Sequence, residues 1–456
     1  MDSIDGAERG PRTKPGLPDR PPFALRGRLL SPLADGTWVD LPDGLVEVDS
    51  SGRIARVAPW VEAPDGAEPG LLLPVHDLRP WILLPGLVDL HTHIPQLPNA
   101  GLGFGLDLLA WLDRYTLPLE RSFDRAAAER LAPLAFRSMA AAGTTTVAAY
   151  TTADPAATDA VFAAAEAHGI RAIVGTVLMD RLPAGIGSDR PMPRAEAILR
   201  DADALCARWH GRDGGRISFA FTPRFAPTCT AALLAGSARM AADRGAYWQT
   251  HLSEDSRELA EVRRLFPEAR DYVDVYDRAG GLRPQTILAH AVHLSQREVG
   301  RLVESGAGVA HCPSSNLFLP SGIMPLARYL EAGVRVGLGS DVSGGPGFSL
   351  FETMRVGAFS QHALITASGD AGPALDPLGW LTLGTLGGAR VLGLDDRIGS
   401  VEAGKEADLV AVDPAATAPV PGTRATEPAE IVSRLIFRTD PGMVRGAWVR
   451  GRLLPA

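Results

Sequence analysis

The sequence predicts an α/β protein: a closed, parallel (β/α)8 barrel of the TIM type with a small β-sandwich domain built from both ends of the chain. Between about residues 82 and 394, apolar, β-branched runs alternate with Ala-rich stretches of helical periodicity. The eight apolar runs are almost uninterrupted, as expected of parallel strands buried on both faces. Short strand-like segments separated by turn residues flank this region on both sides. Together these observations favour one barrel and one composite β domain.

The 456 residues divide into three predicted parts. Residues 1–20, rich in Pro, Gly, Asp and Arg, predict a mobile tail. Residues 21–79 and 395–456 predict the composite β-sandwich, and residues 80–394 predict the barrel. The expected strands of the sandwich lie in FALRGRLLSP, GLVEVDSSGRIARVAP, IGSVEAGKEADLVAVDP, IVSRLIFRT and MVRGAWVRGRLL.

Eight strands and the helices between them make up the predicted barrel. The strands are Ile82–His93, Thr144–Tyr150, Arg171–Asp180, Ile217–Phe225, Tyr247–Glu254, Thr286–His293, Gly308–Asn316 and Arg335–Asp341. The helices include Ala126–Ala142, Pro155–His168, Ala195–His210, Ala231–Arg244 and Gln296–Ser305, with a last one over residues 380–394. An open, doubly wound sheet is the alternative arrangement of the same alternation.

Composition excludes several classes of function. The chain has 45 basic and 53 acidic side chains and no basic run, which argues against a nucleic-acid polymer as partner. No apolar stretch approaches the roughly 18 residues of a membrane span, and the N-terminus lacks the apolar core of a secretory signal. Cys206, Cys229 and Cys312 form no CxxC pair, so a reducing cytoplasm is expected.

Histidines at the ends of the predicted strands indicate a metal site. Function in such barrels lies where strands end at the carboxy-terminal face. His91 and His93 end the first strand and point to the same face, because side chains alternate along a strand. Adding His251 from the fifth strand and Asp341 from the eighth gives three nitrogens and one oxygen. This set suits zinc or iron(II) with a water in an open position.

The remaining histidines have other expected places. His290 ends the sixth strand, and His311 ends the seventh, where we expect it to support the ligands rather than bind the metal. A His-x-His pair by itself is also compatible with a purely structural role, and an Asp such as Asp341 also caps turns. Four further histidines are expected at the surface or at helix ends: His76, His168, His210 and His362.

Several segments resemble the amidohydrolase superfamily and, within it, the zinc-dependent guanine deaminases. The segments that carry the superfamily resemblance are PGLVDLHTH, THLSE, LAHAVHL, AHCPSSN and GLGSDVSGG. Those closer to the guanine deaminases are HTHIPQ, LLAWLDRYTLPLERSF, TPRF, LFPEARDYVDVYD and LGLDDRIGSVEAGKEADLV. The similarity runs from about residue 82 to 413.

The resemblance implies a role for each matched residue. His91, His93, His251 and Asp341 would bind one zinc ion. Glu254 would be the proton shuttle, and His290 would contact the water or the substrate. The residues matching those that hold the guanine ring are Gln96, Arg224 and Phe225. For Arg224 a structural salt bridge is the alternative, and Phe225 would either stack on the ring or aim Arg224.

The scarcity of lysine bears on the number of metal ions. Two-metal members of the superfamily resemble one another in a carboxylated lysine at the end of the fourth strand. Here that strand ends in TPRFAP, and the two lysines of the chain are Lys14 and Lys405. We therefore expect a mononuclear centre. The segments LPNAGLGFG and 180–196 depart from the family, and the second is a predicted lid or substrate gate.

The predicted function is hydrolytic deamination of guanine to xanthine and ammonia in the cytoplasm, with a homodimer expected from the resemblance. The alternatives are deamination or dechlorination of a related ring, such as 8-oxoguanine, another aminopurine or a triazine. A non-catalytic barrel scaffold is a further alternative. The Pro-Cys-x-x-Cys signature of the cytidine-deaminase type is absent from the sequence.

Overall fold

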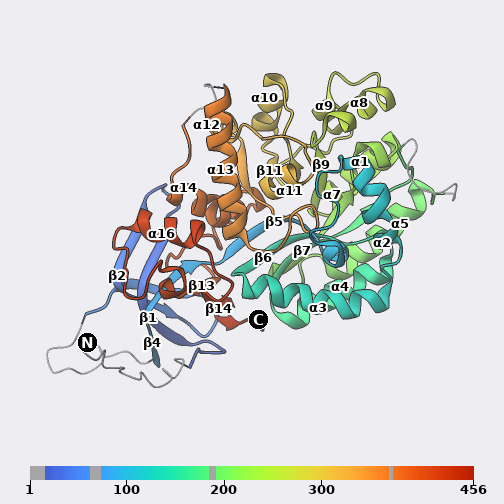
Figure 1. Cartoon of the computed structure of the whole chain (residues 1–456). Coiled ribbons are helices and arrows are strands. Elements are labelled where there is room, and N and C mark those ends of the chain that lie inside the picture. The colour runs from blue at the N-terminus through green and yellow to red at the C-terminus, as the bar shows by residue number, and fades with distance from the viewer. Residues whose placement is uncertain (1–15, 62–72, 184–191, 369–372) are drawn as a thin grey trace, which may run out of the picture.

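The computed structural model describes residues 16–61, 73–183, 192–368 and 373–456, and two sheets organise them (Figure 1). Eight parallel strands close into a barrel, and seven strands from the two ends of the chain form a second, mixed sheet beside it. This arrangement confirms the predicted fold class. The predicted boundaries of the two domains stay predictions.

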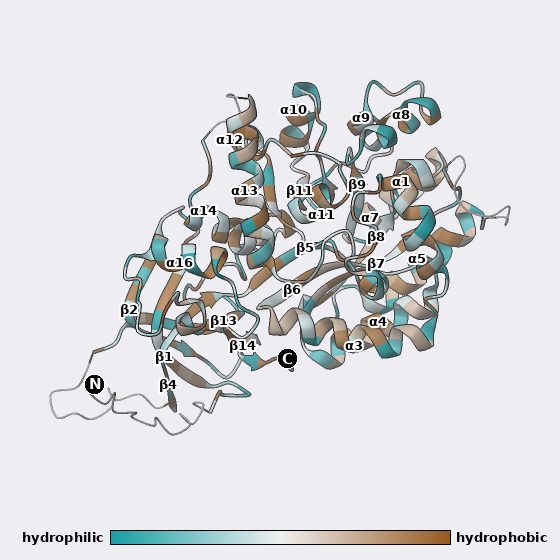
Figure 2. Ribbon diagram, in the orientation of Figure 1, coloured by the Kyte–Doolittle hydropathy of each residue, from teal (hydrophilic) through white to brown (hydrophobic). Residues whose placement is uncertain are grey.

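The barrel strands follow one another around the barrel in chain order, and the last pairs with the first. They are β5 (Leu87–His93), β6 (Thr144–Tyr150), β7 (Arg171–Leu178), β8 (Ile217–Pro223), β9 (Tyr247–Leu252), β10 (Thr286–His290), β11 (Gly308–His311) and β12 (Arg335–Leu338). Almost all of their residues are buried, because helices cover the outside while side chains fill the inside. Hydrophobic residues accordingly colour much of these strands brown in Figure 2.

Long helices cover the barrel, several of them capped by an aspartate, serine or threonine that accepts backbone N–H groups. They are α3 (Arg125–Ala141), α4 (Pro155–His168), α5 (Ala195–Trp209), α7 (Ala231–Asp243), α10 (Gln296–Ser305) and α13 (Leu350–Ser368). The predicted last helix is α14 (Pro377–Thr382) and α15 (Gly388–Leu392) joined by a π-helical turn, η4 (Leu383–Gly387). None of the described helices combines the length and hydropathy that crossing a membrane requires.

Short helices occupy the connections between the strands. After β5 come η1 (Ile94–Asn99), α1 (Leu108–Trp111), η2 (Leu112–Thr116) and α2 (Leu117–Arg121). The others are α6 (Arg212–Gly215), η3 (Ala226–Thr228), α8 (Ser256–Leu265), α9 (Tyr272–Arg278), α11 (Pro313–Phe318), α12 (Leu326–Glu331) and η5 (Pro414–Thr417). The short helices that directly follow a barrel strand lie at the carboxy-terminal face of the barrel, where the predicted site residues are found.

The second sheet joins both ends of the chain in the order β15-β14-β13-β4-β1-β2-β3. Its strands are β1 (Phe23–Pro32), β2 (Trp38–Val48), β3 (Ile54–Pro59), β4 (Val75–Pro85), β13 (Leu409–Val412), β14 (Val444–Val449) and β15 (Arg452–Leu453). Buried Arg171 of β7 contacts Glu406 and Asp408, which precede β13. This ion-pair cluster ties the sheet to the amino-terminal end of the barrel.

The predicted strand Ile82–His93 is wrong in one respect, because two strands share it. Ile82–Pro85 ends β4 of the second sheet, and Leu87–His93 is the first barrel strand. Between them lies Gly86, where a Cβ atom would come within 2.0 Å of the Thr145 side chain. Both strands are buried, so the apolar run gives no sign that the chain passes from one sheet to the other.

Two further segments were predicted as strands but contain helices. In Gly308–Asn316 the strand ends at His311, and Pro313 starts α11, since proline suits the first helical turn. IVSRLIFRT lies largely in α16 (Pro428–Phe437), with Ile431, Val432, Leu435 and Ile436 buried. That spacing is helical, and in a short apolar segment periodicity alone separates helix from strand poorly.

Candidate metal centre and active site

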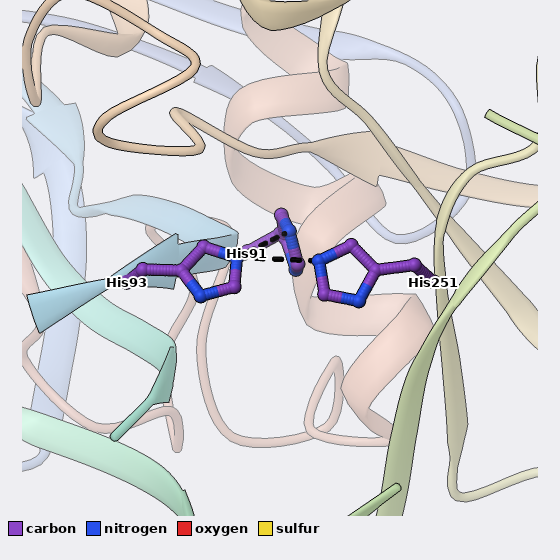
Figure 3. Close-up of side chains that lie close together, drawn as sticks. All are labelled: His91, His93 and His251. Atoms are coloured by element: carbon purple, nitrogen blue, oxygen red, sulfur yellow. Dashed lines mark hydrogen bonds between the residues drawn. The ribbon is translucent and has the colours of Figure 1, made fainter. Parts of the chain in front are cut away.

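Three histidines from two barrel strands direct their ring nitrogens at one point. Figure 3 shows His91 and His93 from the end of β5 facing His251 from β9. The Nε2 atom of His93 lies 3.3 Å from that of His91 and 3.2 Å from that of His251. Asp341, three residues after β12, places Oδ1 3.2 Å from His91 Nε2 and 3.3 Å from His93 Nε2. The four predicted ligands therefore lie together.

The spacing of these atoms fits a tetrahedral metal ion. Zinc bonds of about 2.0–2.1 Å in a tetrahedron place neighbouring ligand nitrogens about 3.3–3.4 Å apart. The nitrogen–nitrogen and nitrogen–oxygen distances given above match this edge length. All four side chains are buried, and a buried cluster of imidazoles and one carboxylate is the donor set expected of a divalent metal site.

The protonation of the ring nitrogens also suits metal binding. The Nδ1 atom of His251 donates to the backbone carbonyl of Arg224 at 2.6 Å, which leaves the lone pair on Nε2 directed at the cluster. Burial, together with the neighbouring histidines, holds the pKa of His251 well below its usual range. Burial likewise lowers the pKa of His91. These rings are neutral near pH 7, as metal ligands must be.

Asp89 and Gly339 hold the ends of β5 and β12 together beneath the cluster. The carboxylate of Asp89 accepts from the backbone N–H groups of His91 and Ser340 and from the Ser340 hydroxyl. Burial raises the pKa of Asp89 to about 7. At Gly339 a Cβ atom would lie 2.8 Å from both His91 Cβ and Cys312 Sγ. The glycine therefore permits the close approach that brings Asp341 to the histidines.

Glu254 and His290 form a second pair beside the four candidate ligands. His290 Nδ1 donates to Asn316 Oδ1 at 2.8 Å, so its Nε2 atom carries the lone pair, 3.4 Å from Glu254 Oε2. Burial, followed by the negative charges of Asp341 and Glu258, raises the pKa of Glu254 well above its usual range. Burial lowers the pKa of His290 to about 4. These shifts favour the protonated form of Glu254 beside a neutral imidazole of His290.

The backbone is strained at the points where these side chains leave their strands. Ser253, His290, Ala291 and Asp341 all have positive φ angles, between 48° and 72°. Such conformations are uncommon for residues other than glycine, and they occur often at functional sites. They turn the chain sharply at the strand ends, so that successive polar side chains face the same space.

A cavity opens beside the cluster. The predicted substrate-binding residues Gln96, Arg224 and Phe225 line it together with His93, His251, Glu254, His290 and Asp341. Four apolar side chains complete the wall: Leu108, Trp111, Leu112 and Leu319. The cavity therefore combines apolar surface with a few polar groups next to the candidate metal ligands, as small-molecule sites do.

Two residues of the site were not predicted from the sequence. Asn316, in the AHCPSSN motif, orients His290 through the hydrogen bond described above. Glu120 in α2 pairs with Arg224 and accepts from Gln96. Arg224 thus makes the salt bridge weighed as the alternative, while also lining the cavity. Both residues lie in segments that carry the family resemblance, AHCPSSN and LLAWLDRYTLPLERSF, but the pattern of the second segment gives no sign that Glu120 is buried.

The other residues considered in the sequence lie apart from the four candidate ligands. Two groups of described side chains could each hold a metal ion: His91, His93 and His251, and His91, His290 and Asp341. His311 is buried beside Trp380 and belongs to neither group, so its supporting role stays a prediction. Lys405 pairs with Glu402 before β13, and Lys14 lies outside the described residues. The predicted tail lies outside them up to residue 15, as does much of the predicted gate, residues 184–191.

Comparison with known proteins defines the family. Residues 82–454 match the Amidohydrolase family. The chain is 41% identical over 379 residues to the probable guanine deaminase of Deinococcus radiodurans, covering 82% of this chain and 83% of that protein. The structure of C. acetobutylicum guanine deaminase with bound guanine superposes with a TM-score of 0.86, at 28% identity, covering 95% and 99% of the two chains.

A third comparison concerns the metal. The structure of an adenosine deaminase from Xanthomonas campestris with bound zinc superposes with a TM-score of 0.79, at 29% identity, covering 96% of this chain and 93% of that one. The protein belongs to the amidohydrolase family. Within that family it is an enzyme whose sequence is similar to those of guanine deaminases, with a site suited to a divalent metal ion.

Proposed function

We propose that the protein hydrolyses guanine to xanthine and ammonia, using one zinc ion held by His91, His93, His251 and Asp341. The observation that carries this proposal is the convergence of the four ligands below a cavity lined by Gln96, Arg224 and Phe225. The similarity to guanine deaminases supports the choice of substrate.

When bound, zinc lowers the pKa of water from about 15.7 toward 7 and so supplies a nucleophile at neutral pH. The rest of the reaction is assigned to residues of this chain. Burial would raise the pKa of Asp341, but the adjacent imidazoles of His91, His93 and His290 favour its ionised form and hold that pKa well below the usual range. Asp341 is therefore ionised near pH 7, and its carboxylate accepts the proton that the attacking water loses.

Glu254 is the group that moves protons on the substrate. Its raised pKa favours the protonated form, from which it donates to a ring nitrogen of guanine as the water oxygen adds to the carbon that carries the amino group. The Glu254 anion then takes the proton that remains on the added oxygen and delivers it to the amine, which leaves as ammonia. The proton held by Asp341 restores the protonated form of Glu254. The reaction balances as guanine plus water giving xanthine plus ammonia. His290, fixed by Asn316, positions the water and Glu254.

Arg224 and Gln96, which line the cavity, orient the guanine ring. A guanidinium group offers donors only, which suits a carbonyl oxygen or an unprotonated ring nitrogen of the purine. Phe225 is buried, with its ring centre 6.4 Å from that of His251, so it limits the width of the cavity next to the ligands. Cytoplasmic location and a homodimer stay predictions from the sequence.

The decisive experiment is a substrate panel on protein of defined metal content. Ammonia release is measured with guanine, 8-oxoguanine, adenine, adenosine and an amino-triazine, alongside zinc and iron determined by mass spectrometry. We expect guanine to be the preferred substrate and about one zinc per chain. Turnover of another ring with none of guanine would refute the proposal, and absence of both metal and turnover after zinc-supplemented expression would favour a scaffold.

A further inference from the structure

Glu120 joins two residues of the cavity wall without lining the cavity itself. It lies on α2, is 7% exposed, and is not among the side chains around the cavity. One of its carboxylate oxygens accepts from Gln96 Nε2 at 2.8 Å, and the other pairs with Arg224 Nη1. Gln96 belongs to η1 after β5, and Arg224 follows β8. A single carboxylate therefore links side chains from two distant strand ends.

The carboxylate fixes which way the amide of Gln96 faces. An ionised carboxylate only accepts hydrogen bonds, so the nitrogen of Gln96 must turn toward Glu120. On the other side, the backbone N–H and the hydroxyl of Ser343 donate to Gln96 Oε1 at 3.3 and 3.4 Å. Both neighbours impose the same orientation. One N–H of Gln96 stays available to a ligand in the cavity.

The same carboxylate balances the charge of Arg224. Arg224 is 3% exposed, and a buried guanidinium without a counter-charge is strongly unfavourable. Glu120 occupies one Nη1 position, and among the described residues no other side-chain partner of this guanidinium is found. Its remaining N–H groups are therefore free to serve a ligand. Together Gln96 and Arg224 present hydrogen-bond donors to the cavity.

We propose that Glu120 is a specificity-determining positioning residue, which makes this wall of the cavity a donor surface and so selects 6-oxopurines over 6-aminopurines. A 6-oxopurine presents two acceptors on one edge, the carbonyl oxygen and N7, whereas a 6-amino group presents N–H donors that this wall would oppose. The inference rests on the proposed function. It adds to that proposal the residue that enforces the polarity of the wall.

Glu120→Gln tests the inference in the full-length, metal-loaded enzyme. The amide is nearly isosteric but uncharged, so Gln96 loses one of the two neighbours that fix its orientation and Arg224 loses its counter-charge. We expect unchanged zinc content, kcat within about threefold, and a KM for guanine raised about 30-fold to 100-fold, the range that loss of a buried charged hydrogen bond predicts. Glu298→Gln is the matched control, because Glu298 is also buried but caps α10.

Selectivity provides the measurement that a merely structural role would not change. 2,6-Diaminopurine keeps the 2-amino group but replaces the 6-oxo group by an amine, and its competitive inhibition constant is measured against guanine. We expect the inhibition constant of 2,6-diaminopurine, divided by the KM for guanine, to be at least tenfold lower in Glu120→Gln than in the wild type, which means weaker discrimination against the 6-amino group. General loosening of the site would weaken both ligands equally and leave the ratio unchanged, which would overturn the inference.

The remaining outcomes are also decisive. If the wild type does not deaminate guanine, the proposed function is refuted. If the wild type deaminates guanine but Glu120→Gln has the same KM and selectivity as Glu298→Gln, only the inference about Glu120 is refuted. Should Glu120→Gln not fold, Glu120→Asp keeps the charge while withdrawing it by one methylene group, and we expect a KM raised about fivefold to tenfold. Loss of the folded protein in both variants would assign Glu120 a structural role and overturn the inference.

Discussion

Replacing Gly339 by alanine should displace the candidate metal ligand His91, although Gly339 is not itself a candidate ligand. Gly339 follows β12, and a Cβ atom added there would lie 2.8 Å from both His91 Cβ and Cys312 Sγ. Atoms in van der Waals contact are about 3.5–4.0 Å apart, so the distance to each neighbour must grow by about 0.7–1.2 Å. His91 and Cys312 are both fully buried, which leaves little room for either to retreat.

The expected loss follows from the narrow tolerance of metal sites. Ligand distances in such sites hold to about 0.2 Å, several times less than the required displacement. We therefore expect Gly339→Ala to lower zinc affinity at least 10-fold to 100-fold, with an overpacking cost of about 1–3 kcal/mol in the free energy of unfolding. Ammonia release should fall in step with metal content.

Zinc affinity is measured by competition with a fluorescent chelator. Metal content is measured by mass spectrometry, and the free energy of unfolding is measured in urea. Gly300→Ala is the matched control: Gly300 lies within α10, and no atom would come within 4 Å of its added Cβ. That variant should keep its zinc and gain slightly in stability. If Gly339→Ala binds zinc as tightly as Gly300→Ala, the view that close packing at Gly339 sets the position of His91 is wrong.

Two further predictions concern the proton shuttle and the link between the sheets. Glu254→Gln should keep the metal, because Glu254 belongs to neither candidate ligand group, and lose about 10²-fold to 10⁴-fold in kcat for guanine; full activity would refute the shuttle. Arg171→Met removes the arginine that pairs with buried Asp408, while Glu406 keeps Arg397 and Arg450; the substitution should cost about 3–5 kcal/mol in urea unfolding at pH 7, and a cost below about 1 kcal/mol would contradict this. Burial by itself would raise the pKa of Glu406, but Arg171, Arg450 and Arg397 lower it from 4.5 to about 2. The ionised Glu406 therefore stabilises the folded state above about pH 4.5, and this stabilisation is lost as the pH falls toward 2. The stability gap between wild type and Arg171→Met should narrow as the pH falls, because protonation removes the negative charges of Glu406 and Asp408 that Arg171 balances.

The sequence alone determined the barrel and the candidate metal ligands. Eight apolar runs between helical segments predict a buried parallel sheet, since each run encodes its own burial. The pairing of β12 with β5 then decides between the predicted barrel and the open-sheet alternative. The strand ends then place His91, His93, His251 and Asp341 at one face, because all parallel strands end on the same side. The absence of lysine at the end of the fourth strand likewise follows from reading the residues in order.

Tertiary structure decided what local periodicity does not encode. Burial looks the same whichever sheet a strand joins, so the change from β4 to β5 at Gly86 was invisible in the sequence. The helix α16 was missed because its short apolar run suits either secondary structure. Glu120 and Arg224 are 104 residues apart, and only the folded barrel makes them neighbours. The sequence places ligands on strands, but the pairing of distant side chains that shapes the cavity depends on how the strands and loops come together.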